Sequence, residues 1–148
     1  MSFQTSVKTC FKKYATFSGR ASRSEFWYFY LFVWGLCVIL LFSSFISLKQ
    51  GQRFSSDIFF WAFAGFGLAT LIPFFAVSAR RLHDINKSGW FQILPYPYSF
   101  LYKFLPALGD GMSLIYGFIF LGLYIYLIVL YYREGEKKKN KYGKPIKI

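Results

Sequence analysis

A dense polar cluster separates two apolar stretches near the middle of this chain. From Arg80 to Trp90 it reads Arg-Arg-Leu-His-Asp-Ile-Asn-Lys-Ser-Gly-Trp, whereas the flanking residues are almost all apolar. Ionisable groups are costly in hydrocarbon, so the cluster must lie at a membrane surface or line a wet cavity. Arginine binds phosphate or carboxylate through two parallel hydrogen bonds, and amides at a helix N-terminus favour anions. These residue types therefore suggest an anion site.

Further basic residues precede the first apolar stretch, and we expect them to share one membrane face with the cluster. Such a site would bind an anionic lipid headgroup or another phosphate-bearing ligand. The candidate binding residues are Arg20, Arg23, Arg80, Arg81, His83, Asp84, Ser88, Gly89 and Trp90. The structural alternative is that the arginines follow the positive-inside rule, with Asp84 and Glu25 as salt-bridge partners. In that case lysine would replace arginine with little loss.

His83 beside Asp84 also invites an acid–base interpretation, because imidazole titrates near neutral pH. Adjacent helical residues point in different directions, however, and no Ser or Cys lies in a recognised nucleophile motif. One histidine with two distant cysteines gives no metal-ligand spacing, and no glycine-rich phosphate loop is present. We therefore expect no enzyme, metal or cofactor. A transporter-like protein or membrane enzyme using His83 and Asp84 is the alternative.

The composition is typical of a membrane protein. Of the 148 residues 55% are hydrophobic and 24% aromatic, which is more apolar surface than a soluble fold of this size can bury. The net charge of +12 would suit nucleic acid, but no recognition motif accompanies it. The basic residues instead gather before Phe26, between Arg80 and Lys87, and after Tyr132, where they would flank membrane spans. No nucleic-acid partner is expected.

Uncharged runs predict an all-α bundle of four membrane spans. The runs 26–48, 58–79 and 111–132 are each long enough to cross a hydrocarbon core of about 30 Å. The remaining span, 88–108, is broken by Pro95 and Pro97 and interrupted by Lys103. Four crossings place the three most basic segments, and both termini, in the cytoplasm, as the positive-inside rule requires. A re-entrant 88–108 segment is the alternative.

Residues 1–25 and 133–148 lie outside the predicted bundle. In the leader, apolar residues from Phe3 to Phe17 recur every three or four positions, which predicts an interfacial amphipathic helix ended by Ser18-Gly19. The same stripe would equally suit a helix docked on the bundle. The region 133–148 is expected to be a basic cytoplasmic arm near the anionic leaflet, in which Asn140 to Gly143 suggests an ordered turn.

Three motifs in order resemble one protein family. They are Phe17-Ser-Gly-Arg-Ala-Ser-Arg-Ser-Glu-Phe-Trp27, then Ala79-Arg-Arg-Leu-His-Asp84 with Ser88-Gly-Trp90, then Asn140-Lys-Tyr-Gly143. Together they resemble the bacterial inner-membrane family called domain of unknown function 805. The resemblance implies a multi-pass location in the bacterial inner (plasma) membrane and a shared polar core, with no activity attached.

The sequence thus predicts a non-enzymatic membrane protein that contacts membrane lipid through its cytoplasmic face. A second hypothesis is a scaffold or partner subunit of a membrane complex, or a homo-oligomer. Gly65 and Ala69 in the second span favour it, because small residues four apart allow close helix approach.

Overall fold

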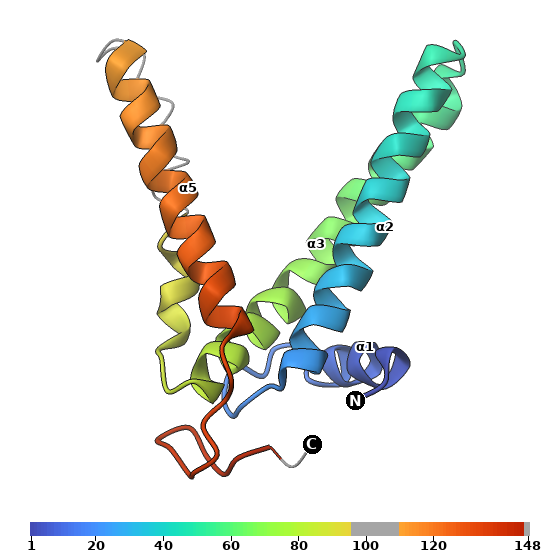
Figure 1. Cartoon of the computed structure of the whole chain (residues 1–148). Helices are drawn as coiled ribbons and strands as arrows, with labels where there is room; N and C mark the ends of the chain where they lie inside the picture. The colour runs from blue at the N-terminus through green and yellow to red at the C-terminus, as the bar shows by residue number, and fades with distance from the viewer. Residues whose placement is uncertain (96–109, 147–148) are drawn as a thin grey trace. The chain divides into compact units, whose positions relative to one another are not determined.

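A computed structural model of the chain describes residues 1–95 and 110–146, without the side chains of 110–113. The described residues form four α-helices: α1 (Phe3–Lys12), α2 (Arg23–Lys49), α3 (Arg53–Asp84) and α5 (Asp110–Tyr132). A short 3-10 helix, η1 (Gly89–Ile93), follows α3 (Figure 1). The predicted all-α class is confirmed.

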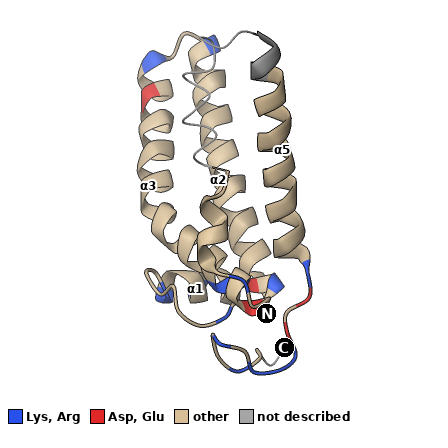
Figure 2. Ribbon diagram, turned by 90° about the vertical axis from the view of Figure 1, so that its left-hand side faces the viewer, with Lys and Arg blue, Asp and Glu red and all other residues tan. Residues whose placement is uncertain are grey.

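Three of these helices are long and apolar enough to cross a membrane: α2, α3 and the part of α5 from Leu114 to Tyr132. They contain the predicted spans 26–48, 58–79 and most of 111–132. Figure 2 shows that charged residues lie towards the ends of the long helices and in α1 and the tail. A helix satisfies its own backbone hydrogen bonds, which is why lipid accepts it. Because α3 continues past the uncharged run to Asp84, its last turns carry the polar cluster.

The predicted span 88–108 begins differently from a membrane helix. Its first residues form the five-residue helix η1, and Ser88 caps it by accepting a hydrogen bond from the Trp90 amide at 3.4 Å. Pro95 follows in a turn. The rest of the predicted span, including Pro97 and Lys103, falls on residues 96–109, outside those described.

The chain divides into two compact units, Met1–Thr16 with Ser24–Val77 and Phe17–Arg23 with Ser78–Ile148. The first unit is a hairpin of α2 and α3. Ring pairs join the two helices at Tyr30–Phe74 (centroids 6.1 Å apart) and Phe32–Phe66 (5.8 Å). Residue numbers rise along one helix as they fall along the other, so α2 and α3 run antiparallel.

The leader helix α1 packs on α2 in this first unit. Phe3 meets Tyr28 and Phe11 meets Phe29 edge to face, with centroids 5.9 and 5.5 Å apart, and Cys10 is fully buried. The stripe therefore contacts α2 with part of its surface, while Phe3, Phe11 and Phe17 remain partly exposed. The helix ends at Lys12, earlier than the predicted end at Ser18-Gly19, because the chain turns away there to bring Tyr14 to α3.

Tyr14 compensates for a proline inside α3. Pro73 has no backbone N–H, so the carbonyl of Ala69 lacks its usual helical donor. The Tyr14 hydroxyl donates a hydrogen bond to this carbonyl at 2.5 Å. A side chain from the leader thus supplies the donor that the helix lacks.

The second unit is centred on the ends of α3 and α5. Leu82 packs with Leu127 and Leu130 in a buried cluster, against which Phe91 of η1 and Tyr131 are partly buried. This apolar contact brings the final turn of α5, and the chain after it, to the polar cluster at the end of α3.

Candidate functional site

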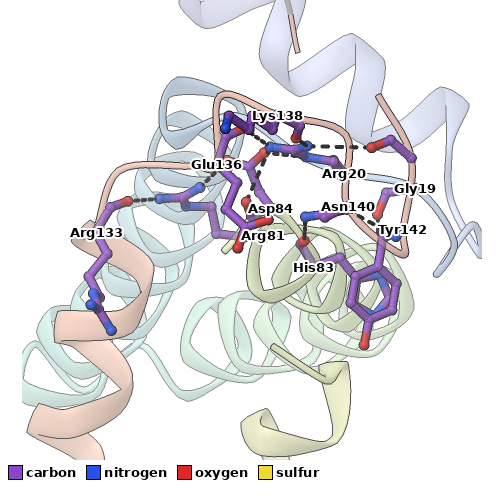
Figure 3. A network of polar contacts seen from close by, with 11 residues as sticks. Gly19, Arg20, Arg81, His83, Asp84, Arg133, Glu136, Lys138, Asn140 and Tyr142 are labelled. Carbon is purple, nitrogen blue, oxygen red and sulfur yellow. Dashed lines mark hydrogen bonds and ion pairs between the residues drawn. The ribbon is translucent and has the colours of Figure 1, made fainter. Parts of the chain in front are cut away.

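Asp84, the last residue of α3, is the centre of a buried ion-pair network in the second unit. One carboxylate oxygen, Oδ1, accepts from Arg20 Nε at 2.7 Å, and the other, Oδ2, accepts from Arg81 Nη1 at 2.6 Å. Asp84 is 6% exposed and Arg81 is fully buried. Figure 3 shows the two guanidinium groups converging on this carboxylate, one from the segment before α2 and one from α3.

The remaining nitrogens of Arg20 bind main-chain oxygens. Nη1 donates to Lys138 O at 3.0 Å, whereas Nη2 donates to Glu136 O and, at 3.2 Å, to Asp84 O. The first two acceptors belong to residues 133–146, which we call the tail. Arg20 is consequently enclosed between Asp84 and the tail (Figure 3).

Arg81 likewise donates hydrogen bonds to main-chain oxygens, in its case at the end of α5. Its Nε donates to Tyr131 O at 3.0 Å, and its Nη2 donates to Arg133 O. Two buried guanidinium groups thus share one carboxylate, and backbone carbonyls accept the other hydrogen bonds. A buried charge without such partners would cost several kcal/mol, so these carbonyls are needed to keep both arginines in place.

A glycine allows the tail to approach Asp84. A Cβ placed on Gly135 would lie 1.9 Å from Asp84 Oδ2, so a residue with a side chain does not fit at position 135 in this arrangement. The next amide, that of Glu136, donates to Asp84 O at 2.9 Å. The tail backbone therefore lies beside the carboxylate at Gly135 and bonds to the main-chain carbonyl of Asp84 at Glu136.

The tail ends in a tight turn that holds the neighbouring histidine. Asn140 and Gly143 exchange backbone hydrogen bonds of 3.1 Å, with Gly143 at φ +132°. The Asn140 side chain donates to His83 O at 3.0 Å and accepts from the Tyr142 amide at 3.0 Å. Tyr142 stacks on the His83 ring with centroids 3.7 Å apart and an interplanar angle of 5°. The tail thus contains the turn that Asn140 to Gly143 suggested, and this turn contacts the end of α3.

His83 and Asp84 have different partners. The Nδ1 of His83 lies 3.2 Å from Gly19 O, whereas both Asp84 oxygens are bonded to arginines. His83 lies beyond the uncharged part of α3. Burial lowers the pKa of its imidazole below the usual value, and Lys141 lowers it further, against a raising effect of the Gly19 hydrogen bond. The neutral ring therefore suits its stacked, half-buried position.

The other predicted site residues lie around this network. Arg80 is 1% exposed, and its carbonyl accepts from the Ala21 amide at 3.0 Å. Arg23 is exposed and pairs with Glu134 at 3.4 Å. Trp90 is 77% exposed, so it points away from the buried arginines.

Gly89 is fixed by close packing against α3. A Cβ there would lie 2.8 Å from the Cβ of Ala79 and 3.3 Å from His83 Nε2. The structure therefore brings Gly89 beside His83, and Arg20 and Arg81 to Asp84.

Sequence reasoning missed the acceptors that complete the network, since they are tail carbonyls and a glycine. Two signals pointed to them: the Asn140-to-Gly143 turn and a glycine, Gly135, inside a strongly charged segment. Among the residues that the structure describes, no group of three or more His, Cys, Asp or Glu side chains is arranged to hold a metal ion.

The tail also presents exposed basic side chains. We call Lys137, Lys138, Lys139, Lys141 and Lys144 the tail lysines, and all five are exposed. The backbone between them is anchored by Arg20 and by the Asn140 turn. The arrangement can hold positive charge at a fixed surface.

Comparisons with known proteins place the whole network inside one family. The model described as "Protein of unknown function (DUF805)" matches residues 14–144. The inner membrane protein YhaI of Escherichia coli (strain K12) is 29% identical over 132 residues, which cover 89% of this chain and 86% of YhaI. The inner membrane protein YhaH of the same strain is 32% identical over 91 residues, 56% of this chain and 65% of YhaH. No solved structure matches the chain.

The family match runs from Tyr14, which bonds α3, to Lys144 in the tail, and so includes Arg20, Arg81 and Asp84. Relatives named as inner membrane proteins and three long apolar helices indicate the same location. This chain is therefore a multi-pass inner-membrane protein that belongs to the DUF805 family.

Proposed function

We propose that this protein is non-enzymatic and binds anionic phospholipid headgroups at its cytoplasmic face through the tail lysines. The observation that carries the proposal is that an anchored tail exposes all five of these lysines. Each basic residue near an anionic leaflet contributes about 1 kcal/mol of attraction. Holding the lysines on an ordered backbone lowers the entropy that binding would otherwise cost.

The buried arginines are not the primary contacts in this proposal. Arg20 and Arg81 donate to Asp84 and to backbone carbonyls, and both are buried. A headgroup would have to displace those acceptors before reaching them. The exposed lysines, and Arg23 beside them, are accessible without such a change.

We also propose that 88–108 crosses the membrane, giving four spans with both termini in the cytoplasm. The support comes from contacts among helix ends in the second unit. Arg20 and Arg23, at the start of α2, pair with Asp84 at the end of α3 and with Glu134 just after α5. These three helix ends would then share one face, so α5 starts at the other face and the chain must cross between α3 and α5. The positive-inside rule assigns the shared face to the cytoplasm.

Lipid retention in the purified protein tests the headgroup proposal. Wild type and a Lys137→Gln, Lys138→Gln, Lys139→Gln variant are offered equal amounts of phosphatidylglycerol and phosphatidylcholine, and native mass spectrometry measures the bound lipid. We expect the triple variant to lose phosphatidylglycerol about tenfold or more, since it removes three headgroup attractions.

The matched control is Lys49→Gln, Arg53→Gln, which removes basic residues at the opposite ends of α2 and α3. It should leave cytoplasmic-face binding unchanged. Equal phosphatidylglycerol retention by wild type and the triple variant would refute the proposal.

A second candidate function is that of a partner subunit. Among the described residues, nothing lies within 4 Å of a Cβ added to Gly65 of α3, and Ala69, four residues on, is exposed, so this small-residue face is open to another helix. Crosslinking from a cysteine placed at Gly65 should then yield a dimer or a mixed product. Recovery of monomer alone would exclude this function.

A further inference from the structure

The two terminal nitrogens of Arg20 are occupied in an unusual way. They donate to Lys138 O and Glu136 O, two carbonyls of one tail segment, while Nε is held by Asp84. We propose that Arg20 is a latent phosphate-binding site that the tail covers, and that moving the tail aside opens it to a phosphate group.

The geometry of the guanidinium supports this assignment. With Nε fixed on Asp84, each terminal nitrogen donates to a tail carbonyl, and Nη2 donates to Asp84 O as well. A phosphate that replaced the two tail carbonyls would accept from both terminal nitrogens as a bidentate partner. The tail backbone therefore acts as a stand-in for the anion. Figure 3 shows the tail passing directly over this side of Arg20.

The charge balance favours an anion over the carbonyls. Arg20 and Arg81 share the single carboxylate of Asp84, so the three side chains keep a net positive charge. The other acceptors of the two arginines are neutral carbonyls. The bonds from Arg20 to carbonyls are already charge-assisted by the guanidinium, and a phosphate oxygen adds the opposite charge and a bidentate geometry. A phosphate oxygen is thus a better acceptor for Arg20 than a peptide carbonyl.

The tail is held in a way that permits displacement. Between 133 and 144 every side chain is exposed or only half-buried. Its attachments are polar or aromatic: the Glu136 amide on Asp84, the Asn140 side chain on His83 O, and the stacked Tyr142. Segments with few buried apolar contacts open at low cost. Tail lysines drawn to an anionic surface would pull on this segment.

The inference rests on the proposed function for its ligand class, since an anionic headgroup is the phosphate nearest to the tail. The test uses Gly135→Ala in the full chain. The new Cβ would overlap Asp84 Oδ2, so the tail or the Asp84 side chain must shift and the enclosure of Arg20 is disturbed, while all tail lysines remain. Gly122→Ala is the matched control, because an added Cβ there meets nothing within 4 Å.

Two measurements are made on these proteins. Phenylglyoxal labelling followed by peptide mass spectrometry reports access to Arg20. Retention of phosphatidylglycerol, with and without inorganic phosphate as competitor, reports binding. We expect Gly135→Ala to raise both Arg20 labelling and phosphatidylglycerol retention about tenfold, and Gly122→Ala to raise neither. Adding Arg20→Lys to Gly135→Ala should abolish the gain, because lysine lacks the fork.

Each outcome decides the inference. Unchanged labelling in Gly135→Ala, or labelling without an Arg20-dependent gain in retention, overturns it. Competition by inorganic phosphate identifies a soluble phosphate as sufficient, whereas resistance identifies the lipid headgroup. If Gly135→Ala does not fold, Asn140→Ala with Tyr142→Ala removes two attachments without a clash and must give the same gain. A failure confined to the lysine variants would count against the proposed function alone.

Discussion

Replacing Asp84 by Asn should unfold the part of the second unit where Arg20, Arg81 and the tail meet. The substitution keeps the shape of the side chain and removes the one carboxylate that Arg20 and Arg81 share, at 2.7 and 2.6 Å. Removing one partner of a buried ion pair costs about 3–5 kcal/mol, because the remaining charge stays buried without compensation. Here two cations lose their partner, so we expect the upper part of that range. Domains have a total stability of only about 5–15 kcal/mol, which makes this a large loss.

The assay is unfolding in detergent, which is monitored by proteolysis of the tail and by loss of the helical circular-dichroism signal. Glu134→Gln is the control, because its pair with Arg23 is longer, at 3.4 Å, and the Glu134 side chain is 74% exposed. Exposed pairs contribute about 0–1 kcal/mol, so this variant should behave like wild type. If Asp84→Asn is no less stable than Glu134→Gln, the network does not hold the second unit together and the reasoning fails.

Three further perturbations address other contacts. Tyr14→Phe removes the donor to Ala69 O and should lower stability by about 1 kcal/mol, seen as a lower unfolding midpoint; an unchanged midpoint would mean that the carbonyl finds water. Gly89→Ala places a Cβ 2.8 Å from that of Ala79 and should cost about 1–3 kcal/mol, and Ala79→Gly in the same chain should restore part of it. Burial lowers the pKa of His83 below 6.5, so the folded state disfavours imidazolium. Stability should be full above that pH and fall as the pH drops through 6.5 towards the lower folded pKa, whereas His83→Gln should flatten this part of the curve.

The membrane helices were the part of the fold that the sequence predicted best. Long uncharged runs are a local signal, since each helix satisfies its backbone internally and needs only length and apolar side chains. The end of α1 was harder to predict. Its apolar stripe continues to Phe17, but the helix ends at Lys12 because Tyr14 bonds to α3, a contact over 55 residues of sequence.

The candidate site was predicted in its residue types but not in its partners. Because burying an unpaired charge is costly in free energy, Arg20, Arg81 and Asp84 were expected to have polar partners. Their positions at helix ends predicted that all three lie at the same membrane face. The tail acceptors of Arg20 are main-chain oxygens, which carry no residue signature and lie 116 and 118 positions away along the chain. Only a three-dimensional structure could reveal that Gly135 allows the tail to reach Asp84.

The span between Arg20 and its acceptors also sets an order of events during biosynthesis. Arg20 is made before any of the long helices, whereas Lys138 is made after all of them. The tail hydrogen bonds of Arg20 can therefore form only after α5 has been synthesised, whereas its ion pair with Asp84 needs only residues up to the end of α3. Until then Arg20 lacks its tail acceptors, so a chain that stops before the tail differs chemically at this site from one that includes it. The closed network is thus a molecular record that α5 and the tail have both been synthesised.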